Sequence, residues 1–334
     1  MIPVQNIPRQ IKLQFDFFEP HALIRGGFAQ TIIGSQFTGS TDLPNRQIHK
    51  VRVDPKSVLV VLELSAEDPD SPLVLLAHGM GGCSESGYMK RIAHKLWQRG
   101  LGVFMMNHRG SGPGMGLSDR LWNGGDSDDL EKVIEYMAEL HPRRPIEVVG
   151  FSLSGNILLK YLGEGSKHPL RVSRAFAVNP PIDLKIASHI ISRSRAGRVF
   201  NRYYMKLIHR QGEALAECFP QAFLPPKSRT ILDFDIAYTA PAAGFRDVDE
   251  YYSKCSSKRF LDSIVIPTTL LCSEDDPFIP MDVFKTVRMS SAIELHTPEQ
   301  GGHMGYISQR TTPWGDRRWM DHVIVEWACE GKGG

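Results

Sequence analysis

The stretch Gly150-Phe151-Ser152-Leu153-Ser154-Gly155-Asn156 lies directly between an apolar strand-like run at 146–149 and a helical pattern at 153–162. A strand that passes straight into a helix needs a tight turn, whose apex is strained and whose neighbours must be small. Gly150 stands two residues before Ser152, and Gly155 stands three after it. Ser154 occupies the place of the second glycine in the pattern G-x-S-x-G, so the motif is degenerate. Ser152 is favoured as the apex over Ser154, because the residue two before Ser154 is not glycine.

Apolar runs typical of strands alternate with helical patterns on both sides of this turn. The strand-like runs are 58–62, 73–77, 103–106, 146–149, 175–178, 268–272 and 292–296. The helical patterns are 86–99, 126–140, 153–162, 281–288 and 315–329. Continuous apolar strands separated by helices are typical of a parallel sheet that is covered on both faces. The sequence therefore predicts an α/β fold with a mostly parallel central sheet flanked by helices.

The alternation stops between about Ile182 and Lys258, where helical patterns occur without a clear strand. An insertion of this size above the strand ends is typical of a lid or cap. We expect a core at 1–181 that includes an N-terminal extension, a helical cap at 182–258 inserted after the sixth strand, and the rest of the core at 259–334. The cap offers apolar candidates for a pocket wall, which are Phe200, Tyr203, Tyr204 and Met205.

A serine nucleophile needs a base, and the base needs a carboxylate that orients it. The run 268–272 leads into an acidic loop, where the spacing D-x-x-x-P selects Asp276 and leaves Asp275 as the alternative acid. The run 292–296 leads into a glycine-rich loop that carries His303. Serine, acid and histidine in this order, each at the end of a strand, favour a Ser152–Asp276–His303 catalytic triad.

The loop His78-Gly79-Met80-Gly81-Gly82 follows the run 73–77. Attack on an acyl carbonyl produces an oxyanion, which backbone N–H groups stabilise. In a strand–turn–helix site of this kind, one donor comes from such a loop and the other from the residue after the nucleophile. The N–H groups of Met80 and Leu153 are the predicted oxyanion-hole donors.

The composition limits the partners that the chain could bind. A net charge of +2 over 334 residues favours no nucleic-acid partner. The chain has no metal-binding spacing and no phosphate-binding glycine motif, so we expect neither a metal nor a cofactor. The expected partner is instead a small-molecule acyl ester.

The cysteines and the hydropathy of the chain bear on its location. The five cysteines include no C-x-x-C pair, which favours reduced thiols in a cytoplasmic protein. The segment 1–18 lacks the apolar core of a signal peptide, and no run approaches the roughly 18 apolar residues of a membrane span. A basic stretch at 193–210 leaves peripheral contact with a membrane open.

Further motifs follow a pattern known from one group of enzymes. They are Phe18-Glu19-Pro20-His21, Gly26-Gly27-Phe28-Ala29-Gln30-Thr31, the loop 78–82, Asn107-His108-Arg109-Gly110, Asp235, Gly244-Phe245, Glu250-Tyr251-Tyr252, Ser256, Pro267, Asp275-Asp276 and Gly301-Gly302-His303-Met304-Gly305-Tyr306. With these motifs the chain resembles the YheT-like branch of the α/β-hydrolases, which also includes yeast medium-chain ethyl ester synthase/esterases and mammalian abhydrolase-domain lipases. The resemblance implies the α/β-hydrolase fold and a triad esterase for short- to medium-chain acyl esters, with no metal.

The residues and the resemblance together predict a serine hydrolase that cleaves carboxylic esters through an acyl-enzyme. Two alternatives stay open. The same acyl-enzyme could pass its acyl group to an alcohol, as an acyltransferase or ester synthase does. Ser154 in the turn also leaves open a non-catalytic binding protein on a hydrolase scaffold.

Overall fold

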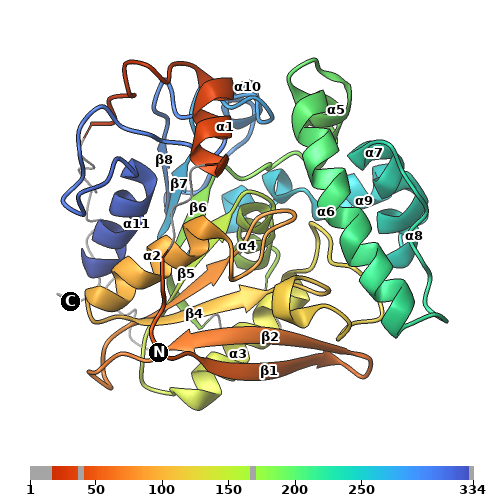
Figure 1. Cartoon of the computed structure of the whole chain (residues 1–334), viewed down its shortest axis with the longest axis horizontal. Helices are drawn as coiled ribbons and strands as arrows, with labels where there is room; N and C mark the ends of the chain where they lie inside the picture. The colour runs from red at the N-terminus through yellow and green to blue at the C-terminus, as the bar shows by residue number, and fades with distance from the viewer. Residues whose placement is uncertain (1–16, 37–40, 166–170, 331–334) are drawn as a thin grey trace, which may run out of the picture.

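The core of the protein is a single sheet (Figure 1). The computed structural model describes residues 17–36, 41–165 and 171–330, so 1–16 of the predicted N-terminal extension lie outside the described residues. Within these ranges the sheet has eight strands in the order β1-β2-β4-β3-β5-β6-β7-β8. The strands are β1 (Gln47–Asp54), β2 (Ser57–Leu64), β3 (Leu73–Ala77), β4 (Gly102–Asn107), β5 (Ile146–Phe151), β6 (Val172–Val178), β7 (Thr268–Leu271) and β8 (Ile293–His296).

The sheet is mostly parallel, which confirms the predicted fold class. β2 runs antiparallel to both β1 and β4, and every other neighbouring pair from β4 to β8 is parallel. The inner strands β3, β4 and β5 are buried along their whole length, as their continuous apolar sequences predict. β1 was not predicted, because this edge strand is polar and largely exposed.

Helices cover both faces of the sheet, and the alternation of side chains along each strand serves both. On one face Leu73 and Leu75 pack with α3 (Ser127–Leu140) and α4 (Leu153–Gly163). On the other face Val74 and Leu76 pack with α2 (Gly87–Gln98) and α11 (Trp319–Glu330). Because successive strand residues point to opposite faces, one apolar strand supplies two hydrophobic cores.

The chain between β6 and β7 forms a group of helices that lies beside the sheet (Figure 1). They are α5 (Leu184–Arg193), α6 (Gly197–Cys218), α7 (Ile231–Phe234), a π-helical turn (Asp235–Thr239), α8 (Ala240–Ala242) and α9 (Val248–Cys255). Side chains cap several of them: Asp183, Thr230 and Asp247 each accept a backbone N–H of the first turn. We refer to these helices as the cap; its predicted limits at 182 and 258 stay a prediction.

Two predicted helices differ in length from the observed ones. The helix predicted at 281–288 is the single turn α10 (Asp282–Lys285). After it the chain is held elsewhere, because Ser290 donates to the carbonyl groups of Leu261 and Ile264. The helix predicted from residue 315 begins at Trp319. Residues 317 and 318 pair instead with 307 and 308 through backbone contacts, which delays the start of the helix.

A short helix near the N-terminus, α1 (Gly27–Gln36), packs against the loops that follow β7 and β8. The contact is made by backbone. A Cβ atom on Gly27 would lie 1.7 Å from the Asp275 carbonyl oxygen, and one on Gly34 would lie 2.6 Å from Gly305 Cα. These glycines therefore allow α1 to approach the two loops that carry the predicted acid and base. The sequence did not predict this helix.

Candidate active site

Ser152 stands at the apex of the turn between β5 and α4, as the sequence predicts. Its backbone φ of 51° lies in a region that residues other than glycine rarely adopt. The Ser152 N–H donates to the Val178 carbonyl group at 2.8 Å, which fixes the strained turn to β6. A Cβ atom on Gly150 would lie 2.6 Å from the Ser154 carbonyl oxygen, so the turn requires glycine at position 150.

Ser154 fits the turn because its side chain has polar partners. Its Oγ donates to the His78 carbonyl group and lies 2.7 Å from His108 Nε2. The His108 ring in turn stacks on Trp122, with 4.1 Å between ring centroids. The hydroxyl group thus joins the nucleophile turn to the loop that follows β3. A glycine at position 154 is not required by this geometry.

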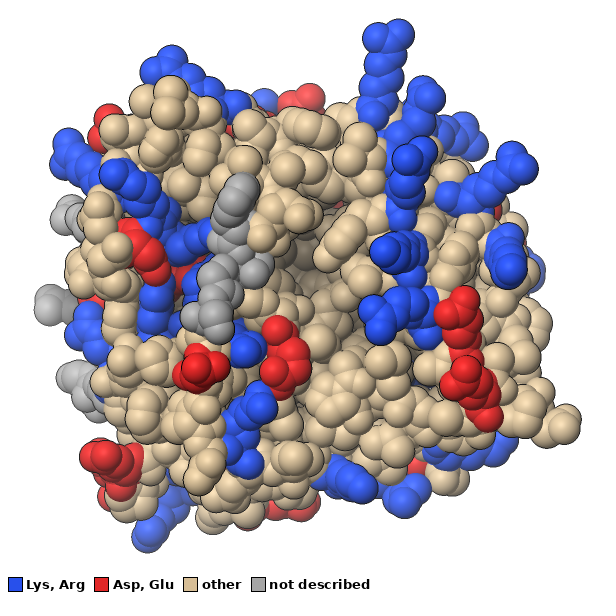
Figure 2. Space-filling view, viewed as in Figure 1, with Lys and Arg blue, Asp and Glu red and all other residues tan. Residues whose placement is uncertain are grey.

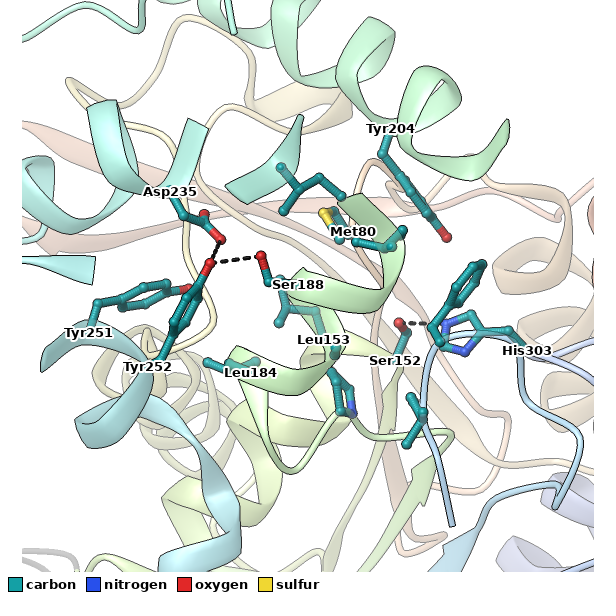
Figure 3. A pocket seen from close by; sticks show the side chains of 16 residues that line it. Met80, Ser152, Leu153, Leu184, Ser188, Tyr204, Asp235, Tyr251, Tyr252 and His303 are labelled. Atoms are coloured by element: carbon teal, nitrogen blue, oxygen red, sulfur yellow. Dashed lines mark hydrogen bonds between the residues drawn. The ribbon is translucent and has the colours of Figure 1, made fainter. Parts of the chain in front are cut away.

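Ser152, Asp276 and His303 meet at the carboxyl edge of the sheet, although they are far apart in the chain. His303 Nε2 lies 2.8 Å from Ser152 Oγ, and His303 Nδ1 lies 2.8 Å from Asp276 Oδ2. All three residues are buried, and the Phe278 ring contacts the imidazole edge to face at 4.9 Å between centroids. Figure 3 shows the Ser152–His303 hydrogen bond at the wall of a pocket.

The Asp276 carboxylate is held on both of its oxygen atoms. Oδ1 accepts the N–H groups of Phe278 and Ile279 at 2.8 and 3.1 Å, and Oδ2 accepts both His303 and the side-chain amide of Asn179. Asp275, the alternative acid, points elsewhere, and its Oδ1 accepts the Gly302 N–H at 2.8 Å. Asp276 therefore contacts the imidazole, whereas Asp275 supports the loop that carries it.

Asn179 is a site residue that the sequence analysis missed. It directly follows β6 with a φ of 43°, a conformation that asparagine tolerates better than most residues. Its Nδ2 donates to Asp276 Oδ2 at 2.7 Å, and its Oδ1 accepts the Tyr306 hydroxyl group at 3.0 Å. An asparagine at the end of a buried strand, directly before two prolines, was the available signal.

Thr31 on α1 is a second residue that the sequence analysis gave no role. Its Oγ1 accepts the His303 N–H at 2.8 Å and donates to the Gly27 carbonyl group at 2.6 Å. The neighbouring Gln30 exchanges hydrogen bonds with the backbone of Ile307, in the same loop. The available signal was the Gln30-Thr31 pair, which the resemblance had marked without a role.

The two predicted oxyanion donors belong to the same site. Met80 and Leu153 line the pocket that contains Ser152 and His303. Their backbone N–H groups make no hydrogen bond with any residue that the structure describes. The loop passes very close to the nucleophile, because a Cβ atom on Gly79 would lie 3.1 Å from Ser152 Cβ. Two unused backbone donors are therefore available beside the serine.

The pocket extends from Ser152 into the cap and is partly open to solvent. Its wall is largely apolar and includes Leu184, Ile191, Ile231, Phe278 and Ile279. Of the four cap residues predicted for this wall, Tyr204 lines it. Phe200 and Met205 are buried in the hydrophobic core, and Tyr203 is exposed.

Comparison with known proteins places the chain among hydrolases. A model of the alpha/beta hydrolase fold family matches residues 72–309. Phospholipase ABHD3 of Mus musculus is 29% identical over 242 residues, which cover 71% of this chain and 58% of that protein. YheT of Escherichia coli is 28% identical over 274 residues, with coverages of 79% and 78%. Monoacylglycerol lipase of Saccharomyces cerevisiae is 27% identical over 269 residues, with coverages of 75% and 58%. The chain thus spans little more than half of the phospholipase and of the yeast lipase.

Solved structures agree on the fold. A soluble variant of the Saccharomyces cerevisiae monoglyceride lipase superposes with a TM-score of 0.56 at 16% identity, covering 89% of this chain and 98% of that one. An esterase of Pyrococcus furiosus gives a TM-score of 0.53 at 15% identity, covering 95% and 97%. At these identities the likeness shows the fold alone. With the family model spanning most of the sheet, the chain belongs to the alpha/beta hydrolase fold family, and its resemblance to the YheT-like branch is confirmed.

Proposed function

We propose that the protein is a serine hydrolase that cleaves carboxylic esters, with Ser152 as nucleophile, His303 as general base and Asp276 as the acid that orients the base. The observation that carries the proposal is the hydrogen-bonded chain Asp276–His303–Ser152, with both contacts at 2.8 Å. This is the arrangement in which an imidazole can take the proton of a serine hydroxyl group.

In the proposed reaction, Ser152 Oγ attacks the acyl carbonyl carbon while its proton passes to His303 Nε2. The oxyanion that forms is stabilised by the N–H groups of Met80 and Leu153, and each such donor typically lowers the barrier by about 3 kcal/mol. His303 then gives the proton to the departing alcohol, which leaves an acyl-enzyme. In the second half a water molecule attacks the acyl carbon and loses its proton to His303. The bond to Ser152 Oγ then breaks, His303 returns the proton to this oxygen atom, and the acid is released.

The surroundings of the imidazole support this role. His303 Nδ1 faces a carboxylate whose other contacts are donors, so the proton stays on Nδ1 and Nε2 is left to accept from the serine. The developing imidazolium would be paired with a buried carboxylate. Such electrostatic stabilisation in a site shielded from water is worth more than in bulk solvent.

The apolar pocket favours an acyl ester of short to medium chain length as the substrate. Its aliphatic wall matches a hydrocarbon chain, and burial of each CH₂ group contributes about 0.8 kcal/mol. The names of the relatives, a phospholipase and a monoacylglycerol lipase, favour an ester of a fatty acid. We also keep a cytoplasmic setting as a proposal, supported by the wide spacing of the five cysteines, which include no C-x-x-C pair.

Hydrolysis of p-nitrophenyl butyrate, hexanoate, octanoate and decanoate tests the proposal. We expect the wild-type protein to release p-nitrophenol and Ser152→Ala to lose at least about a thousandfold in kcat. Ser253→Ala, on an exposed position of α9, is the matched control and should keep full activity. Equal rates of hydrolysis by the wild type and Ser152→Ala would exclude Ser152 as nucleophile, whereas no hydrolysis by either protein would favour the binding-protein alternative.

Acyl transfer shares this acyl-enzyme and differs only in the acceptor. Product analysis with ethanol added at increasing concentration separates the two outcomes. An ester synthase would form the ethyl ester in preference to the free acid at low ethanol, whereas a hydrolase would release mainly the acid.

A further inference from the structure

A single carboxylate lines the pocket at the end remote from the His303 imidazole, among the described residues. Figure 3 shows Asp235 on the cap side of the pocket, with Met80 and Leu153 between it and Ser152. Asp235 begins the π-helical turn Asp235–Thr239. Turns of this kind are rare in proteins, and those that occur are often found at functional sites. The pocket is thus apolar along its length and polar at its far end.

Hydroxyl groups from separate helices surround this carboxylate. The Tyr252 hydroxyl group on α9 donates to Asp235 Oδ2 at 2.8 Å and is hydrogen-bonded to Ser188 Oγ on α5 at 2.7 Å. The hydroxyl groups of Ser188 and Thr239 also lie close to the carboxylate and favour its charged form. These four residues form what we call the Asp235 cluster. The hydrogen bond from Tyr252 orients the carboxylate, and Asp235 still lines the pocket.

No cation neutralises this carboxylate, since none of the described residues forms an ion pair with Asp235. Burial raises its pKa to about 6, so the group is mostly ionised near neutral pH. A buried charge without a counterion is costly unless hydrogen bonds satisfy it. A carboxylate offers about four acceptor positions, so it can accept a further donor beside its protein partners.

We propose that the Asp235 cluster is a subsite for a hydroxyl group of the substrate, remote from the ester bond. The inference rests on the proposed esterase function and adds a selectivity to it. A plain alkyl end would displace water from the carboxylate without replacing its hydrogen bond. A site built to bind a hydroxyl group therefore discriminates strongly against the analogue that lacks it.

A hydroxyl group fits this subsite better than an ammonium group. Two of the three side chains around Asp235, those of Ser188 and Tyr252, line the pocket, and each carries a hydroxyl group. These hydroxyl groups can accept as well as donate, which matches a ligand group that also does both. An ammonium group has donors only, and its burial would cost a second desolvated charge.

The hydroxyl group could belong to either half of the ester, because the carbonyl group at Ser152 divides the substrate into an acyl part and an alcohol part. Two pairs of substrates separate these sources. The acyl arm compares p-nitrophenyl esters of ω-hydroxy acids from hexanoate to decanoate with the unsubstituted esters. The alcohol arm compares glyceryl monooctanoate with propyl octanoate.

The experiment measures kcat/KM for each pair with the wild type, Asp235→Asn and Ser188→Ala. We expect the wild type to prefer the hydroxylated ester in at least one arm by about tenfold or more, as for a hydrogen bond to a charged group. Asp235→Asn should lower kcat/KM for the hydroxylated ester by about tenfold more than it lowers kcat/KM for the plain ester. A role confined to cap folding would instead lower both values together.

Binding to Ser152→Ala, measured by calorimetry, tests the subsite without catalysis. We expect the hydroxylated ester to bind more tightly than its plain partner, and Ser152→Ala combined with Asp235→Asn to bind both alike. If the wild type shows no turnover but this binding preference is observed, the esterase proposal is refuted and the hydroxyl subsite is not. Equal binding of both esters, an unchanged preference in Asp235→Asn, or a stronger preference for an ω-amino ester would overturn the hydroxyl subsite.

Discussion

The Ser154 hydroxyl group links the nucleophile turn to the loop of the predicted oxyanion donor. It is shared between the His78 carbonyl group and His108 Nε2, and all three residues are buried. Because this hydroxyl group gives its proton to the carbonyl oxygen, His108 Nε2 carries the imidazole proton. His108 Nδ1 is then an acceptor, and no described residue donates to it.

We predict that Ser154→Gly is less stable than the wild type, although it restores the usual glycine of the motif. Loss of the hydroxyl group leaves two buried polar partners unsatisfied, which typically costs about 1–3 kcal/mol. Urea unfolding measures the change. Ser154→Ala is the matched control, since it removes the hydroxyl group and keeps the Cβ atom, and should show most of the loss. An unchanged or higher free energy of unfolding in Ser154→Gly would contradict this account.

His78 makes stability depend on pH. Burial lowers its pKa from 6.5 to about 4. The unfolded chain therefore binds a proton below about pH 6.5 that the folded protein accepts only near pH 4, so this stability is complete above pH 6.5 and is lost as the pH falls towards 4. The loss amounts to about 3 kcal/mol.

We expect His78→Gln to remove this pH dependence. As the pH is lowered from about 7 to about 4.5, the free energy of unfolding of the wild type should fall by up to about 3 kcal/mol more than that of His78→Gln. Comparison of the two proteins cancels the contributions of the other titrating groups. A difference that stays constant over this range would show that His78 is not buried in its neutral form.

At the scale of secondary structure, α1 supports the loop that carries His303. Its Thr31 accepts the His303 N–H, and its glycines place its backbone against the two loops of the predicted acid and base. A helix from the N-terminal segment thus holds a loop that is far away in the sequence, since Thr31 and His303 are 272 positions apart.

We predict that Thr31→Val lowers kcat by about tenfold, because a catalytic group displaced by about 1 Å can lose about a hundredfold in rate. Valine has nearly the same shape as threonine but leaves the His303 N–H without its acceptor. Thr31→Ser keeps the hydroxyl group and should stay close to the wild type. If both variants lose activity equally, the effect comes from packing and not from the hydrogen bond.

The sequence predicted those elements whose pattern depends on burial. β3, β4 and β5 are apolar throughout and lie inside the sheet, so their runs were recognisable. β1 and α1 were not, because β1 is a polar edge strand and α1 contains two glycines that serve close contacts with other loops. The contacts of Asn179 could not be predicted either, because they depend on which loops meet in the folded protein and not on the local sequence.

At the scale of the whole molecule, a stripe of cations borders the hollow in the face shown in Figure 2. Arg198, Arg202, Lys206 and Arg210 follow each other at four-residue spacing on α6 and are all exposed. None of them forms an ion pair within the described residues. We call these residues the α6 stripe. No helix in the described ranges has both the length and the apolarity to cross a bilayer.

We predict that the α6 stripe binds vesicles containing phosphatidylserine, and that replacement of its four cations by glutamine abolishes sedimentation with them. Each cation near an anionic membrane contributes about 1 kcal/mol at moderate salt. Binding should weaken as salt is added. Replacement of Lys50, Arg52, Lys56 and Lys132 is the matched control, because these exposed cations lie at the β1 edge and on α3. Unchanged sedimentation of the stripe variant would exclude this contact.

The central claim is that the Ser152 hydroxyl group is activated by His303. A fluorophosphonate reacts with such a serine, and mass spectrometry of the digested protein identifies the modified residue. We predict one adduct, on Ser152, formed quickly by the wild type and at least about a hundredfold more slowly by His303→Ala. Absence of an adduct, or an adduct on another serine with Ser152 unmodified, would contradict the account.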